Sequence, residues 1–237
     1  MFYKEPVALS NEAHLDLKCT ENINFSFAAA TNSVPLLGIE FYEAAKEYPI
    51  IFVKVDESVI PCTLNGLKDK QNLFVSDDFQ WDARYVPSYV RRYPFVVTEP
   101  SEDGKQGVFV DLDCERFNSE NGAALFDEKG EETPFLIETK NFLSQHYAHS
   151  KVTENFCAWL MKENLFTEMA AKFQLSSGEE FLFDHLLVID EKKLMSLSQK
   201  KVMELFKLGW LGWIYAHLMS LTNMSLLIDR YAKSLEK

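Results

Sequence analysis

The sequence changes character near residue 130, and this change constrains the fold more than any other feature. Before it, short runs of β-branched and aromatic residues alternate with turn-forming residues; after it, apolar residues recur at spacings of three and four. The first pattern is typical of strands and the second of amphipathic helices. The sequence therefore predicts an α+β protein whose β-rich N-terminal half, a small curved sheet or partial barrel, packs on a helical C-terminal half.

Individual strands and helices follow from the same patterns and from the prolines that limit helices. The predicted strands are 14–18, 23–27, 50–55, 59–64, 72–75, 95–98 and 107–112, with a later one at 180–189 after a turn at 176–178. The predicted helices are 38–48, 82–93 (helical at least from Ser88), 134–150, 153–173 with a break near Asn164, 199–208, 210–221 and a last one ending at Leu235.

The two halves are not separated by any visible linker. No repeat, low-complexity segment or flexible stretch lies between residues 1–130, the β-rich half with two short helices, and residues 131–237, the mainly helical half. We therefore expect one integrated unit in which the halves pack together.

Composition narrows the class of partner. The chain of 237 residues has 36 acidic and 24 basic residues, a formal net charge of −12. Nucleic-acid surfaces need clustered Lys and Arg, so we expect no nucleic-acid partner. The four cysteines form no CxxC pair and suit buried free thiols in a reducing compartment. The N-terminus lacks a signal-peptide pattern, and we expect a cytoplasmic location.

An uncharged stretch from Leu208 to Ile228 has the length of a membrane span. It contains Gly, His, Ser, Thr and Asn residues, which make insertion into a bilayer costly. We therefore expect no membrane span and interpret the stretch as a buried pair of helices.

The sequence contains none of the common short motifs of catalysis or cofactor binding, so we expect no cofactor. His146 and His149 are spaced to share a helix face, but no third ligand is indicated and we expect no metal site. His217 lies in an apolar run and titrates near neutrality, which makes it the candidate general base. The alternative is a hydrogen-bonded core histidine.

Residues 81–95 form the densest polar and aromatic segment, which we call the Arg-aromatic segment. An arginine offers a planar fork for carboxylate or phosphate and stacks on aromatic rings. The candidate ligand-binding residues are Arg84, Tyr85, Arg91, Arg92 and Tyr93. The alternative is structural: the arginines would pair with Asp82, Asp111 or Asp113 while the aromatic rings fill the core.

Several short segments resemble a known family. They are Asn32–Leu36, Glu40-Phe41, Tyr48–Phe52, Tyr85–Pro87 with Arg91–Phe95, Leu125–Asp127 with Gly130, and Ile214–Leu218 with Ser220-Leu221. As a set they resemble the SapC-like family of bacterial proteins over nearly the whole length. The resemblance implies an association with surface-layer gene clusters and a small-molecule or peptide context, and it supplies no catalytic residue.

These observations favour a non-catalytic binding or accessory protein whose Arg-aromatic segment recognises a small anionic ligand or a protein or peptide partner. The first alternative is an enzyme that modifies a small molecule or peptide, using His217 or a substrate carboxylate held by arginine. The second alternative is a structural protein associated with a surface layer, which fits less well because no export signal is seen.

Overall fold

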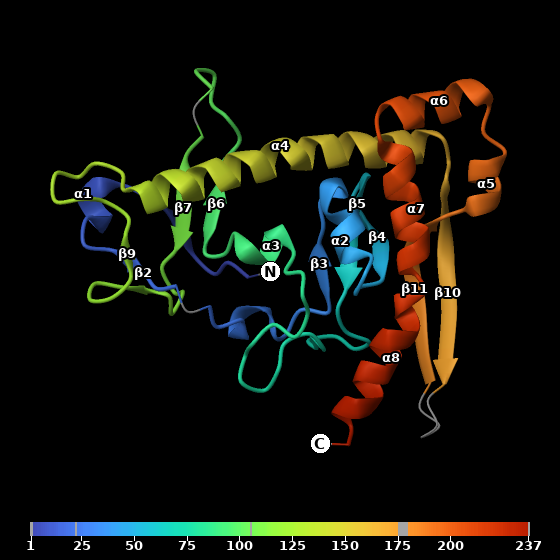
Figure 1. Ribbon diagram of the computed structural model, residues 1–237, viewed down its shortest axis with the longest axis horizontal. Coiled ribbons are helices and arrows are strands. Elements are labelled where there is room, and N and C mark those ends of the chain that lie inside the picture. Colours follow the sequence, from blue (N-terminus) through green and yellow to red (C-terminus); the bar gives the residue numbers. More distant parts are fainter. Residues whose placement is uncertain (1, 22, 105, 175–179, 237) are drawn as a thin grey trace.

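The structure, a computed structural model, describes residues 2–21, 23–104, 106–174 and 180–236 (Figure 1). Its largest sheet has five antiparallel strands in the order β10-β11-β4-β5-β3. The strands are β3 (Ser33–Pro35), β4 (Ile50–Val55), β5 (Ser58–Leu64), β10 (Phe166–Gln174) and β11 (Glu180–Ile189). Because β10 and β11 come from the second half of the sequence, this sheet contains strands from both halves, which supports the proposal of one integrated unit.

Two smaller sheets of three strands lie toward the other end of the molecule (Figure 1). One has β1 (Pro6–Ala8), β7 (Val108–Asp111) and β6 (Phe95–Val97) in that order, and the other has β8 (Phe117–Asn118), β2 (Lys18–Cys19) and β9 (Ala123–Ala124). None of the three sheets in the described part of the chain closes into a barrel. The predicted α+β class, with most strands in the first half and most helices in the second, is confirmed.

The helix α4 (Pro134–Lys162) runs along the molecule from the small sheets to the large one (Figure 1). Its 29 residues span about 43 Å at the rise of an α-helix. Thr133 caps its start by accepting a hydrogen bond from the Leu136 amide. The remaining helices are α1 (Asn11–His14), η1 (Ser26–Ala28), η2 (Gly38–Glu40), α2 (Phe41–Ala44), α3 (Ser88–Arg91), α5 (Glu191–Met195), α6 (Gln199–Lys207), α7 (Trp210–Ser220) and α8 (Asn223–Ser234).

The prediction of a helix over 153–173 is wrong beyond Lys162. Asn164 adopts the left-handed conformation (φ 54°), and the Leu165 and Asn164 amides bond to the Leu160 and Met161 carbonyls. This pair of bonds is the Schellman motif that ends helices. The break predicted near Asn164 is confirmed, but the chain continues from it as the strand β10 and not as a helix. The turn predicted at 176–178 lies outside the described residues.

Three predicted strands are wrong because side chains bond to the local backbone. The Ser10 hydroxyl caps α1, which replaces the start of the strand predicted at 14–18. Asn24 and Asn72 each accept a hydrogen bond from the amide two residues ahead, in the segments predicted as strands 23–27 and 72–75. Such local bonds favour turns over sheet ladders.

Two predicted helices are shorter than expected. The segment 38–48 contains only η2 and α2, and 82–93 contains only α3. In the second case the Glu47 carboxylate accepts hydrogen bonds from the Arg84 and Tyr85 amides. These bonds fix the path of the chain before Pro87, and the proline disfavours helical geometry at the residue before it, so the helix begins only at Ser88. The helices predicted at 134–150 and from 153 onward form one continuous helix, α4, and the remaining predicted strands and helices match observed elements within a few residues.

His217 joins α7 to the large sheet. The register of β11 on β4 pairs Leu187 with Phe52 and, carried two residues further, sets Ile189 opposite Ile50. There the imidazole lies between the strands: its Nδ1 is 2.9 Å from the Ile50 carbonyl, and its Nε2 accepts from the Ile189 amide at 3.1 Å. Ser220 accepts from the Ile50 amide. The neutral imidazole of His217 therefore takes the place of a direct hydrogen bond between the backbones of Ile50 and Ile189.

The interpretation of 208–228 as a buried pair of helices is correct for one face only. In α7 the side chains of Ile214, His217 and Ser220 are fully buried, whereas Tyr215 is 42% and Met219 71% exposed. Among the described residues no single helix is long and apolar enough to cross a membrane, although α7 and α8 together meet that criterion as a bent pair.

The buried imidazole predicts a pH dependence of stability. Burial lowers the pKa of His217 to about 4, below the roughly 6.5 of an unfolded histidine. The unfolded chain therefore takes up the proton first, and acidification from about pH 6.5 to about pH 4 costs up to about 3 kcal/mol of unfolding free energy. Urea denaturation across this range should show a smaller loss for His217→Gln than for the wild type.

The partly exposed His14, whose ring bonds only to Ser10 among the described residues, provides the matched control. His14→Gln should keep the wild-type pH slope. Equal slopes for wild type and His217→Gln would show that the imidazole is not the neutral bridge described above.

Candidate functional site

The arginines of the Arg-aromatic segment do not pair with Asp82, Asp111 or Asp113, the partners considered from the sequence. Asp82 pairs with Arg230 and Asp113 with Lys4. The Asp111 carboxylate accepts from the Lys4 amide and the Tyr93 hydroxyl. In the described part of the chain none of the three arginines has a carboxylate partner, so the structural alternative of Arg–Asp pairs is not what the geometry shows.

Arg92 is half-buried beside α4. Its guanidinium lies over the Tyr89 ring, 4.2 Å from the centroid. Its Nε is buried and has no hydrogen-bond partner among the described residues. Leaving a buried charged donor unsatisfied is costly, so this atom is a natural position for a ligand acceptor.

Arg91 lies on the outer side of the same turn. Its Nε donates to the Val86 carbonyl at 2.9 Å, and its guanidinium stacks between the rings of Tyr85 (5.9 Å) and Phe142 (5.3 Å). Phe142 belongs to α4, so Arg91 spans the gap between the Arg-aromatic segment and that helix.

His146 of α4 lies near both arginines. Burial and the positive charges of Arg92 and Arg91, with a smaller contribution from His149, lower its pKa to about 4. The imidazole is therefore neutral at pH 7. These two arginines create a positive potential around a side chain that sequence analysis considered only as a metal ligand.

A buried network fixes this arrangement, and its centre is Glu40. The carboxylate is 5% exposed and accepts from the Leu37 amide, the Ser88 amide and hydroxyl, and the Tyr85 hydroxyl at 2.5 to 2.9 Å. Burial and these contacts with Glu40 raise the pKa of Tyr85. Four donors satisfy the buried carboxylate, as such groups require.

Ser88 continues the network to α4, with its hydroxyl oxygen 3.0 Å from His146 Nδ1. A hydroxyl has one hydrogen, and here Ser88 donates it to Glu40. His146 Nδ1–H must then donate to Ser88, which leaves Nε2 as an acceptor without a hydrogen bond in the described part of the chain. A nucleophile would need the reverse order, with histidine accepting from serine.

Two adjoining cavities share Leu37 and His146 and form what we call the α3–α4 cleft. The cavity on the Arg92 side has about 190 Å³ and is lined mainly by apolar side chains, including Leu36, Val59 and Pro61. The cavity on the Arg91 side has about 200 Å³ and includes Glu40, Tyr85 and Phe142. The cleft therefore combines two arginines with an apolar wall and two carboxylates that protein groups already engage, Glu40 in its buried network and Glu154 paired with Lys151.

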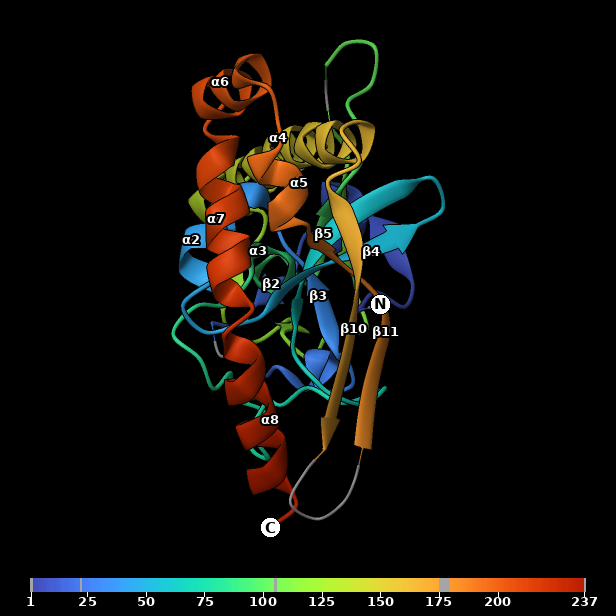
Figure 2. The ribbon, with the colours of Figure 1, turned by 90° about the vertical axis from the view of Figure 1, so that its right-hand side faces the viewer.

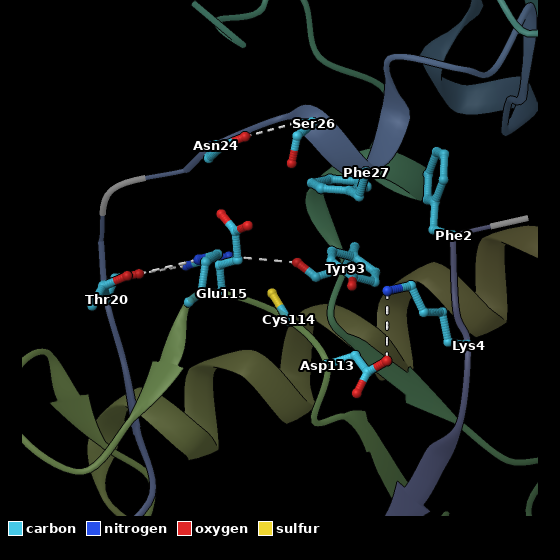
Figure 3. Close-up of a pocket in the computed structure, with 11 residues that line it drawn as sticks. Phe2, Lys4, Thr20, Asn24, Ser26, Phe27, Tyr93, Asp113, Cys114 and Glu115 are labelled. Carbon is cyan, nitrogen blue, oxygen red and sulfur yellow. Dashed lines mark hydrogen bonds and ion pairs between the residues drawn. The ribbon is translucent and has the colours of Figure 1, made fainter.

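Arg84 and Tyr93 lie outside the cleft. Arg84 is exposed and lines neither cavity. Tyr93 stacks on Phe27 with a centroid distance of 4.1 Å, in the wall of a separate pocket of about 690 Å³ that also contains Phe2 and Cys114 (Figure 3). The structure thus brings Tyr85, Arg91 and Arg92 together and separates the other two ligand-binding candidates from them.

The cations of the separate pocket are already engaged by protein groups. Lys4 pairs with Asp113 (Figure 3). Arg116 donates to the Thr20 carbonyl through Nε and a terminal nitrogen and to the Tyr93 carbonyl. These contacts join four chain segments, so the pocket is less suited than the α3–α4 cleft to an anionic ligand.

His217, the candidate general base, is fully buried. It is 0% exposed, and both ring nitrogens bond to backbone groups of Ile50 and Ile189. This arrangement leaves neither nitrogen for a substrate and fits the alternative of a hydrogen-bonded core histidine.

Sequence reasoning missed Glu40, Ser88 and His146 as parts of one site. Glu40 lies in one of the segments that resemble the family, and Ser88 lies inside the Arg-aromatic segment. Their meeting with His146 depends on contacts between residues 48 and 58 positions apart, and no local pattern encodes such contacts.

Comparison with known proteins places the chain in a family. The model of the SapC family matches residues 9–227 of the 237-residue chain, and the protein therefore belongs to the SapC family. No curated protein and no solved structure is significantly similar to it.

The Glu40 network predicts a large effect on stability. Glu40→Ala leaves four donors facing a cavity, and we expect a loss of about 3 to 5 kcal/mol of unfolding free energy in urea denaturation. Glu43, which lies in α2 and pairs with Lys46 at the surface, is the control. Glu43→Ala should change stability by less than about 0.5 kcal/mol, and similar losses for both variants would contradict a central role for Glu40.

Proposed function

We propose that this SapC-family protein is a non-catalytic binding protein that holds a small carboxylate-bearing ligand in the α3–α4 cleft. The observation that carries the proposal is the pair of arginines, Arg91 and Arg92, on either side of His146 without a carboxylate partner among the described residues. Arginine recognises carboxylates through its planar set of donors.

The position of the charged group follows from Arg92. Its buried Nε lacks an acceptor within the described part of the chain, and the guanidinium is held by stacking on Tyr89 and not by an ion pair. A ligand carboxylate would supply the missing acceptor without first displacing a protein carboxylate. Because other protein atoms cover Nε, the side chains over it must move apart for the ligand to reach this donor.

The size and polarity of the rest of the ligand are inferred from the cavity on the Arg92 side. Leu36, Val59 and Pro61 face this space, and its volume of about 190 Å³ is below the roughly 300–1,000 Å³ of sites for drug-sized molecules. A compact apolar group next to the carboxylate matches both features. A peptide C-terminus with an apolar last side chain has the same chemistry.

Benzoate is a suitable probe because it joins a carboxylate to a compact apolar ring. Calorimetric titration should show binding of benzoate that Arg92→Gln weakens at least about tenfold, since a hydrogen bond between charged groups contributes roughly 1.5–3 kcal/mol. Arg91→Gln should weaken it less. Acetate should bind more weakly than benzoate because it leaves the apolar wall uncovered.

Arg84→Gln is the matched control, since Arg84 belongs to the same segment but lies outside the cleft. It should leave the affinity for benzoate unchanged, and thermal denaturation of each variant verifies its fold. The proposal fails if benzoate does not bind, or if Arg92→Gln and Arg84→Gln have the same effect.

A further inference from the structure

The outer face of α7 carries large apolar side chains that the fold itself does not cover. Leu208 is 49%, Tyr215 42% and Met219 71% exposed, and Leu211 is half-buried. Leu211, Tyr215 and Met219 follow one another at four-residue spacing on one side of α7, and Leu208 lies just before the helix, ahead of the left-handed Gly209. The buried Ile214 and His217 occupy the opposite side, so α7 has two apolar faces and only one of them packs inside the molecule.

Further exposed apolar residues lie on the neighbouring helices α2 and α8. Tyr42 of α2 is 53% exposed, and its hydroxyl lies against Gly212, where a Cβ would come within 2.0 Å of it. Leu226 of α8 is 50% exposed. In Figure 2 the helices α6, α7 and α8 form one edge of the molecule. We call the surface made by Leu208, Leu211, Tyr215, Met219, Leu226 and Tyr42 the α7 face.

The segment that supplies most of the α7 face is also without charge. No Asp, Glu, Lys or Arg occurs from Leu208 to Ile228, although a quarter of the chain is charged. Isolated exposed apolar residues are common, but a continuous apolar patch marks an interaction surface. Exclusion of charge with enrichment in Tyr and Met is typical of the central part of protein interfaces.

We propose that the α7 face binds a second copy of this chain in a two-fold symmetric dimer. A chain with a net charge of −12 repels its own copies over most of its surface. The uncharged face is where two copies can approach without that repulsion, and an apolar stripe complements itself about a two-fold axis.

The charges at the two ends of the face favour an antiparallel arrangement. Lys207 precedes the face and Asp229 follows it, and both are exposed. When two α7 helices pack antiparallel, Lys207 of each copy lies toward Asp229 of the other. These contacts would fix the register of helices that the apolar residues hold together.

Sedimentation velocity over a range of protein concentrations tests the proposal with the full chain. The wild type should be a dimer, and Met219→Glu should weaken the dimer at least tenfold because it places a charge in the centre of the face. Met195→Glu, which alters a 73% exposed methionine on α5, should leave the dimer intact. Thermal denaturation verifies that both variants fold.

The antiparallel orientation of the two copies is tested by exchanging the charges of Lys207 and Asp229. Lys207→Asp alone should weaken the dimer, and adding Asp229→Lys should restore it. A wild type that stays monomeric at all concentrations overturns the proposal, as does a dimer that Met219→Glu leaves unchanged. A monomer that instead binds phosphatidylglycerol vesicles through Met219 would assign the face to a lipid surface and also overturn it.

Discussion

The buried carboxylate of Glu40 is the interaction on which the proposed site depends. It lies between β3 and α2, yet its partners include the Tyr85 hydroxyl and both the amide and hydroxyl of Ser88. Ser88 passes the connection to His146 on α4. A carboxylate without these donors would be too costly to bury, so the Arg-aromatic segment is held against α4 at one position. Arg91 and Arg92 follow Ser88 by three and four residues and are therefore placed on either side of His146.

His217 plays a comparable part in the large sheet. Its imidazole bridges β4 and β11 where their ladder ends, and it connects α7 to both strands. In each case a buried polar side chain has partners far away in sequence, which fixes one arrangement of the elements. Burial lowers the pKa of both His217 and His146, but only one of them can meet a ligand. His217 is enclosed by backbone groups, whereas His146 borders the α3–α4 cleft.

The sequence predicted the class of fold and those elements whose own residues determine them. The hairpin of β4 and β5 and the helices α6, α7 and α8 follow from the local sequence patterns, and α4 does so in part, since it was predicted as two helices. Several failures occurred where a side chain bonds to the backbone, as Asn24 and Asn72 do nearby and Glu47 does across the fold. The helix predicted over 153–173 failed for another reason, because a backbone Schellman motif at Asn164 ends α4. The site was predicted in part: Arg91 and Arg92 were singled out by residue type, but their separation from Arg84 and Tyr93 arises from packing that no pattern expresses.

The central claim is that a ligand carboxylate binds beside Arg92 and His146, and the protonation of His146 reports on it directly. An NMR titration of the His146 ring should give a pKa of about 4 in the free protein. In the presence of benzoate the bound negative charge should raise this pKa. A pKa of His146 that benzoate does not change would contradict the account.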